Sequence, residues 1–194
     1  TQIAVKAMMS WTKMGQRLDL MPIGAVIAPA PLAVCPEDGL VVPRKGYEDE
    51  QVETLGALVA SRAYLAAKDK GPDFQLGMIQ ETLGENSQAA WSYLRASWRA
   101  KGEVRTAALT ESLRAYTALL AGGAGDTEQT WSNDLLAGEI ERQLGRFDAA
   151  RARFERLQAD PRAKSPPFNI IVPYELQLIS DRDSAPHLIP QALP

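Results

Sequence analysis

Apolar positions follow two different periods along this chain. Near the start they alternate with other residues, as at Ile3, Val5 and Ala7, which predicts a short strand. Over residues 47–160 they recur every three or four positions, which predicts helices. We therefore expect an extended N-terminal segment followed by a helical body.

Glycine and proline divide the helical pattern into segments. Proline is absent from residues 73–160, and its cost of about 3 kcal/mol inside a helix makes this the region where helices run most freely. Glycines between the segments mark the helix ends. The expected helices cover approximately residues 48–70, 74–83, 87–101, 104–121, 128–144 and 147–160. One more helix is expected to begin near Pro173. The Pro-rich tail after it is expected to be irregular or to lie along the surface.

A β-hairpin is predicted within the extended N-terminal segment. Ala33 and Val34 lead through Cys35 into a Pro-Glu-Asp-Gly turn, and Leu40 to Val42 return as the second strand. The Asp-Gly pair favours this turn because glycine accepts the positive φ that tight hairpin turns need.

Two stretches of the helical region resemble tetratricopeptide repeats. In the first, Gly138, Gly145, Ala150 and Phe154 stand where that family has a small residue, a turn glycine, a small alanine and an aromatic. The second stretch, residues 88–121, carries matching residues about 43 positions earlier, a longer offset than the family's 34. Its matching residues are Trp91, Leu94, Trp98, Gly102 and Ala107.

A broader resemblance spans roughly residues 3–180. The order of three motifs, at residues 15–20, 34–39 and 144–147, is similar to that of bacterial proteins in the domain of unknown function 2225 family. Those proteins couple C-P-x-C-G knuckles to a helical repeat region. Because the family is uncharacterised, the resemblance implies an architecture and leaves the biochemical role open.

The chain departs from this family at the knuckle. Cys35, Pro36 and Gly39 fit the C-P-x-C-G pattern, but Asp38 stands in place of the second cysteine, and the other knuckle is absent. Structural zinc needs four ligands, so we predict no zinc and no cofactor. Packing would then hold the hairpin, with Cys35 as a small buried apolar residue.

These patterns together predict a fold class and a division of the chain. The fold is expected to be mainly α, with tetratricopeptide-like helical hairpins and a small N-terminal β-hairpin. Residues 1–46 form the extended segment with its degenerate knuckle, residues 47–182 the helical-hairpin domain, and residues 183–194 a Pro-rich tail.

Composition excludes several classes of function. The 194 residues carry 21 Lys and Arg against 24 Asp and Glu, so the chain lacks the basic excess of a nucleic-acid binder. The single cysteine rules out a multi-cysteine metal site, and the single histidine makes a histidine-based catalytic triad improbable. No run of 18 apolar residues predicts a membrane span. One cysteine fits a reducing or an oxidising compartment, with the cytoplasm favoured over the periplasm.

Partner-binding residues follow from the tetratricopeptide resemblance. In such repeats the first helix of each pair lines a concave groove, which implies that Ser92, Arg99, Glu139 and Arg142 face a partner. Two arginines in one groove can hold a carboxylate or an acidic peptide by bidentate bonds. Five arginines in the later hairpin allow the same reading, or an ordinary solvated face on which they pair with neighbouring acids. They are Arg142, Arg146, Arg151, Arg153 and Arg156.

The sequence thus predicts a non-enzymatic protein–protein interaction module, an adaptor or accessory subunit of a larger assembly, with no small-molecule substrate. The alternative is a small-molecule or metal-dependent enzyme whose ligands lie in a missing N-terminal part, because the chain begins at Thr1 without a methionine. A further option is a hairpin that pairs with a partner's sheet through an exposed edge.

Overall fold

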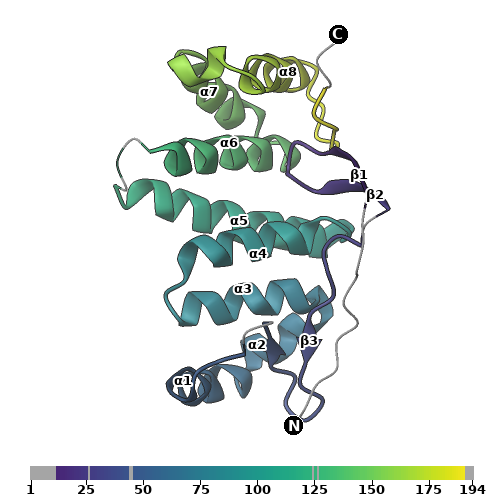
Figure 1. The fold of residues 1–194 in the computed structure, drawn as a ribbon, viewed down its shortest axis with the longest axis vertical. Coiled ribbons are helices and arrows are strands. Elements are labelled where there is room, and N and C mark those ends of the chain that lie inside the picture. The colour runs from purple at the N-terminus through teal and green to yellow at the C-terminus, as the bar shows by residue number, and fades with distance from the viewer. Residues whose placement is uncertain (1–11, 26, 44–45, 124, 126, 191–194) are drawn as a thin grey trace. The chain divides into compact units, whose positions relative to one another are not determined.

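The computed structural model describes residues 12–25, 27–43, 46–123, 125 and 127–190. It is mainly helical with a small N-terminal antiparallel β-hairpin, which confirms the predicted fold class at this level (Figure 1). The strand predicted at Ile3, Val5 and Ala7 lies outside the described residues. Contacts group the chain into two compact units, the first of residues 1–12 and 26–115 and the second of residues 13–25 and 116–194. The division into three sequence domains stays a prediction.

Unit 1 contains a hairpin and most of the early helices. In chain order its elements are β3 (Ala33–Val34), β4 (Val41–Val42), α1 (Asp49–Val59), α2 (Arg62–Ala66), the 3-10 helix η1 (Ala67–Lys70), α3 (Pro72–Thr82), α4 (Asn86–Ser97) and the greater part of α5 (Gly102–Ala121). Helices α3, α4 and α5 agree with the predicted segments to within a few residues. Gly84 and Gly122 follow the ends of α3 and α5, whereas α4 ends at Ser97, before Gly102.

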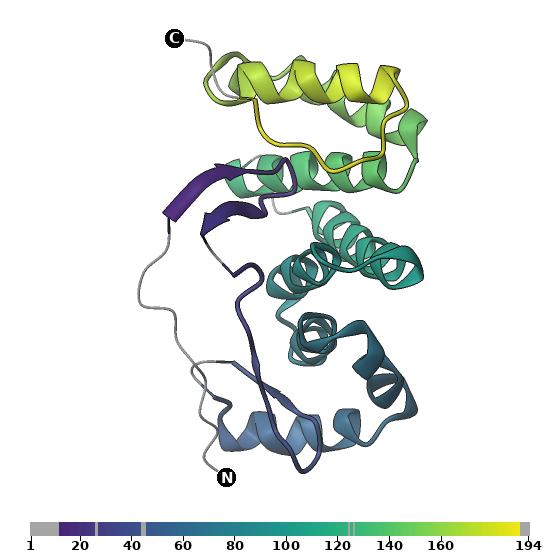
Figure 2. The same cartoon turned by 90° about the vertical axis from the view of Figure 1, so that its right-hand side faces the viewer.

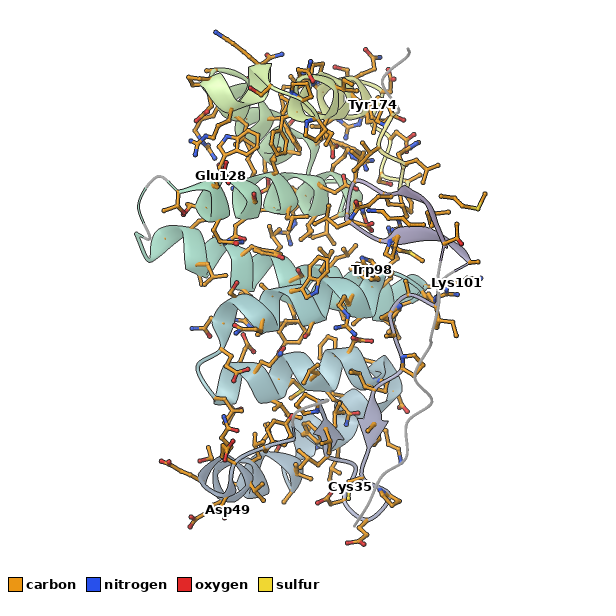
Figure 3. All side chains as sticks on the ribbon, in the orientation of Figure 1. Cys35, Asp49, Trp98, Lys101, Glu128 and Tyr174 are labelled. Carbon is orange, nitrogen blue, oxygen red and sulfur yellow. The ribbon has the colours of Figure 1, made fainter. Side chains whose placement is uncertain are left out.

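The predicted hairpin is present as β3 and β4. Ala33 pairs with Val42, and Val34 pairs with Val41, in an antiparallel register. Val41 is fully buried in an apolar cluster with Leu55 and Tyr64. Packing therefore holds the hairpin against the helices, as expected. Cys35, which we expected to be buried, is only half-buried at the turn (Figure 3).

One predicted helix proves to be three elements. The apolar pattern of residues 48–70 predicts a continuous helix, but the chain breaks at Ser61, whose backbone is extended. The Ser61 hydroxyl accepts a hydrogen bond from the Tyr64 backbone N–H at 3.1 Å and so begins α2 as its N-cap. The break turns Tyr64 toward the hairpin, and the burial of its ring compensates for the interrupted helix.

Unit 2 contains the first hairpin-like pair of strands and the last helices. In chain order its elements are β1 (Thr12–Gln16), β2 (Pro22–Ala25), α6 (Glu128–Gln143), α7 (Phe147–Gln158), the 3-10 helix η2 (Pro161–Lys164) and α8 (Phe168–Ser180). The pairing of β1 with β2 was not predicted. Thr127 begins α6 as its N-cap by accepting from the Thr130 N–H at 3.1 Å.

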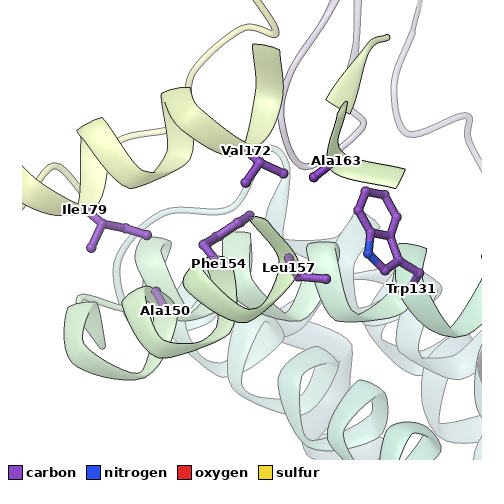
Figure 4. Packing of buried hydrophobic residues seen from close by; sticks show 7 residues of the cluster. All are labelled: Trp131, Ala150, Phe154, Leu157, Ala163, Val172 and Ile179. Carbon is purple, nitrogen blue, oxygen red and sulfur yellow. The ribbon is translucent and has the colours of Figure 1, made fainter. Parts of the chain in front are cut away.

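Helix α8 begins earlier than predicted. It starts at Phe168 and carries Pro173 in its interior, although proline inside a helix removes one backbone hydrogen bond. The apolar core of unit 2 explains the difference, because Val172 is fully buried there beside Phe154 and Ile179 (Figure 4). The burial of Val172, directly before Pro173, favours a helix that continues through the proline.

The tail after α8 returns to the β1–β2 hairpin, as Figure 2 shows. Leu188 forms an antiparallel bridge with Arg17, and the Ile189 N–H donates to the Gln16 carbonyl at 2.8 Å. The Leu18 N–H donates to the His187 carbonyl at 2.9 Å. The predicted irregular tail therefore adds a short extended segment alongside β1.

The same contact recurs in the α3–α4 and α6–α7 pairs. A Cβ atom on Gly77 would lie 2.6 Å from the Tyr93 ring, and one on Gly138 would lie 2.7 Å from the Phe154 ring. These residues occupy the same relative places in their helix pairs, each with a turn glycine between. The α3–α4 pair begins at Pro72, earlier in the chain than residues 88–121, where the second repeat was predicted, and only α4 overlaps that range.

Candidate functional site

The structure places Ser92 and Arg99 of unit 1 against neighbouring parts of the same unit. Ser92 is buried, and its hydroxyl donates to the Gln80 side chain at 2.7 Å. Arg99 is exposed, and its Nε donates to the Ala28 carbonyl. Each side chain thus has a partner within its own unit, and their predicted role toward another protein stays a prediction.

Glu139 and Arg142 lie inside unit 2. Arg142 is 0% exposed and Glu139 is 2% exposed. The guanidinium donates from Nε and Nη2 to Glu139 Oε2 at 2.9 and 2.7 Å. The structure brings these two predicted residues together, but as a buried pair. For them also, partner binding stays a prediction.

Other arginines of the α6–α7 pair contact acids of their own unit. Arg153 binds Glu141 at 2.8 Å and also Asp134, and Arg156 binds Asp134 at 2.9 Å. These contacts favour the reading of this face as a set of ion pairs within the chain.

An open groove in unit 1 combines apolar and charged side chains in its lining. It has a volume of about 520 Å³ and lies over α1, α2, η1, α3, α4 and α5. We call the uncharged part of its lining the floor and the charged part the rim. The rim consists of Lys70, Glu81 and Glu111. The floor consists of Leu58, Ala63, Ala66, Ala67, Phe74, Met78, Thr82 and Tyr93. A second shallow hollow of about 640 Å³ follows the first half of α5 and shares Glu111 with the groove.

An ion network organises the acidic rim of the groove. Arg114 contacts Glu81 and binds Glu111 at 2.7 Å, so it holds both carboxylates in place. The Tyr93 hydroxyl donates to Glu81 Oε2 at 2.8 Å. Burial, together with the nearby Glu81 carboxylate, raises the pKa of Tyr93, which keeps the phenol protonated as a donor.

The basic rim is formed by Lys70 at the end of η1. Its Nζ lies 4.4 Å from the centroid of the Phe74 ring, a distance typical of a cation–π contact. Phe74 in turn packs edge-on against Tyr93, with ring centroids 5.0 Å apart. The groove therefore combines a fixed aromatic floor with charges of both signs on its rim.

The turn from Cys35 to Gly39 is held by hydrogen bonds. The Leu40 N–H donates to Asp38 Oδ1 at 2.9 Å, and this bond, with a smaller contribution from the Cys35 thiol, lowers the pKa of Asp38. In the part of the chain that the structure describes, no three His, Cys, Asp or Glu side chains are grouped as metal ligands. Among those same residues, no helix combines the length and apolar character needed to cross a membrane.

Comparison of the chain with known protein families, with curated proteins and with solved structures finds no match. The resemblances to tetratricopeptide repeats and to the domain of unknown function 2225 family therefore remain predictions.

Sequence reasoning did not identify the groove. Its lining comes from five helices and η1, and most of its members are apolar residues that the pattern assigns to helix cores. One signal was available: Ala63, Ala66 and Ala67 form a cluster of small residues, and small side chains leave room on a helix surface.

Proposed function

We propose that this chain is a non-enzymatic protein–protein interaction module that holds a segment of a partner protein in the groove of unit 1. The observation that carries the proposal is the groove itself, with its apolar floor and its rim of charges. Interfaces between proteins commonly join an apolar centre to a polar rim in this way.

The chemistry of the lining supports binding more than catalysis. The hydroxyl of Thr82 donates to the Met78 carbonyl at 3.0 Å, and that of Tyr93 donates to Glu81. The Thr82 hydroxyl is thus bonded to a backbone carbonyl, which does not activate a nucleophile. The Tyr93 hydroxyl is bonded to the Glu81 carboxylate, but burial and that carboxylate raise the pKa of Tyr93, so the phenol stays protonated. Lys70, Glu81 and Glu111 are suited to selecting charged neighbours at the ends of a bound segment.

Affinity capture with a matched pair of variants tests the proposal. Ala66 is exposed and lines the groove, whereas Ala57 is exposed near the end of α1 and lies outside the lining. We expect A66R to lose a partner that both the wild-type chain and A57R retain, because the long arginine side chain fills the groove. The captured partner is then purified, and its dissociation constant for each variant is measured by calorimetry.

Two outcomes would count against this function. One is a partner that binds A66R as tightly as it binds the wild-type chain, which would move the interface elsewhere. The other is the absence of any partner whose capture differs between A66R and A57R.

A further inference from the structure

Two carboxylates share one buried cation in unit 2. Glu139 Oε2 and Glu175 Oε2 lie 2.9 and 2.8 Å from the same Nε atom of Arg142. The side chains of all three residues are 2% exposed or less. A single guanidinium balances only one of the two negative charges, and burial makes the second one costly.

We propose that Glu139 and Glu175 hold one proton between them, and that this proton locks the C-terminal tail onto the β1–β2 hairpin. The cluster is then a proton-dependent latch built into unit 2. This inference is independent of the groove in unit 1 and does not need a partner protein.

The contacts assign the proton to Glu175. Glu139 accepts bonds from Nε and Nη2 of Arg142 and from the Gln143 side chain, so several donors stabilise its ionised form. Of these three donors, only Nε of Arg142 also donates to Glu175. Burial, with the adjacent Glu139 carboxylate, raises the pKa of Glu175 well above its ordinary value. A protonated Glu175 can donate to Glu139 and complete the cluster.

Charged groups from every neighbouring element surround the pair. Asp19, in the turn between β1 and β2, accepts from Gln143 and is paired with Arg17. Around the cluster and the helix α8 the structure places Arg142 and Glu139 from α6, Arg151 from α7, Asp19 and Arg17 from the hairpin turn, and Asp183 and His187 from the tail. The 3-10 helix η2, which also packs against α8, carries Arg162 and Lys164. Asp19 adds a further buried negative charge and so favours the proton on the pair.

The same guanidinium holds the tail. Nη1 of Arg142 donates to the carbonyls of Asp183 and Ala185 at 2.6 and 2.9 Å. When Glu175 loses its proton, a second carboxylate competes for Arg142 and the cluster gains a buried negative charge. Hydration of that charge requires the tail to move away, because the tail covers the guanidinium.

The direction of the pH dependence follows from this linkage. With the tail detached, Glu175 is hydrated and its pKa returns to its ordinary value, so the open state binds fewer protons than the closed state. Opening therefore becomes more favourable as pH rises from the ordinary glutamate pKa to the raised pKa of Glu175. The change is at most about tenfold in the opening constant per pH unit.

Hydrogen exchange of one amide reports on the latch. The Ile189 N–H is bonded to the Gln16 carbonyl only while the tail is in place. Its protection factor, corrected for the intrinsic exchange rate, is followed between about pH 5 and about pH 9 in the wild-type chain and in E175Q. We expect protection to fall with pH in the wild type. In E175Q it should stay constant, because the amide mimics the protonated acid.

Two further measurements make the assignment specific. The carboxyl carbon shift of Glu175, followed by NMR, should titrate well above the ordinary glutamate range in the wild type and at lower pH in E139Q. The variant H187Q should keep the wild-type pH dependence, which separates the latch from the nearby imidazole. Two results would overturn the proposal: both carboxylates ionised at neutral pH, or the same fall in Ile189 protection in E175Q as in the wild type.

Discussion

Gly138 in α6 lies directly against the ring of Phe154 in α7. A Cβ atom at Gly138 would be 2.7 Å from Cε2 of Phe154, closer than carbon atoms approach in folded proteins. Gly77 and Tyr93 repeat this relationship in the α3–α4 pair, with a closest distance of 2.6 Å. In both helix pairs a missing side chain thus admits an aromatic ring from the neighbouring helix.

Replacing Gly138 by alanine is expected to destabilise unit 2 by about 1–3 kcal/mol, because the methyl group forces Phe154 out of its position. Phe154 is 1% exposed and belongs to the core cluster, so the ring has little room to move. The free energy of unfolding in urea, followed by the tryptophan fluorescence, measures the effect.

Gly56→Ala serves as the control for that substitution. Gly56 lies in α1, and a Cβ atom there would meet nothing within 4 Å. Alanine favours the helix over glycine, so G56A should stabilise the chain by about 0.5–1 kcal/mol. A G138A variant that gains stability as G56A does would show that the close contact with Phe154 is wrong.

The Tyr64 hydroxyl is expected to hold the β3–β4 hairpin onto α2. It accepts from the Val41 N–H and donates to the Gly39 carbonyl, each at 3.2 Å. Because Val41 is fully buried, Y64F leaves an N–H without a partner, at a cost of about 1–3 kcal/mol. The amide exchange rate of Val41 should rise accordingly.

Tyr47→Phe is the matched variant for this test. The Tyr47 hydroxyl donates to the Val41 carbonyl at 2.8 Å, so Y47F removes a bond to the same residue but leaves its N–H bonded. Only Y64F should expose the Val41 amide. Equal exchange rates in the two variants would argue against the anchoring role of Tyr64.

Asp73 makes unit 1 sensitive to mildly acidic pH. Burial raises the pKa of Asp73 to about 6, and the Arg95 guanidinium, 2.6 Å away, lowers it in part. The folded state therefore keeps a proton that the unfolded chain releases, and stability falls as pH rises from about 4 to about 6. The slope is at most about 1.4 kcal/mol per pH unit.

The variant D73N isolates this contribution. It should lack the Asp73 part of the slope, so its stability relative to the wild type should rise across that pH range. Urea unfolding of both proteins at several pH values measures the difference. A difference that is constant from pH to pH would mean that folding does not change the pKa of Asp73, and would contradict the account.

Much of the fold could be predicted from local sequence signals. The Asp38-Gly39 turn predicted the β3–β4 hairpin, and Gly84 and Gly145 marked the turns of the two repeated helix pairs. These signals work because a tight turn constrains φ locally, whatever the rest of the chain does.

The two helix boundaries that were predicted wrongly have a common cause in long-range packing. The apolar spacing continues unbroken across Ser61, so it predicts one helix where the chain forms three elements. Pro173 favours a helix start, but the helix begins earlier because Val172 is buried in the core.

The polar interior was beyond sequence reasoning. Glu139 and Arg142 have the types and spacing of an ordinary surface pair, and the resemblance to repeat proteins assigned them to a groove. Their burial depends on Glu175 and on carbonyl groups of the tail, which are distant in sequence and carry no local signal. The groove of unit 1 was missed for a similar reason, because the apolar spacing assigns most of its lining residues to helix cores.

Site-specific photo-crosslinking in the native host tests the central claim most directly. Thr82 lines the groove and is exposed, and Thr54 is an exposed threonine on α1 outside the groove. Each donates its hydroxyl to the carbonyl four residues earlier, at 3.0 Å, so the two sites are closely matched. A photoreactive amino acid at position 82 should form an adduct with a specific protein, and the same group at position 54 should not. Adducts of equal yield from both positions, or none from position 82, would contradict the account.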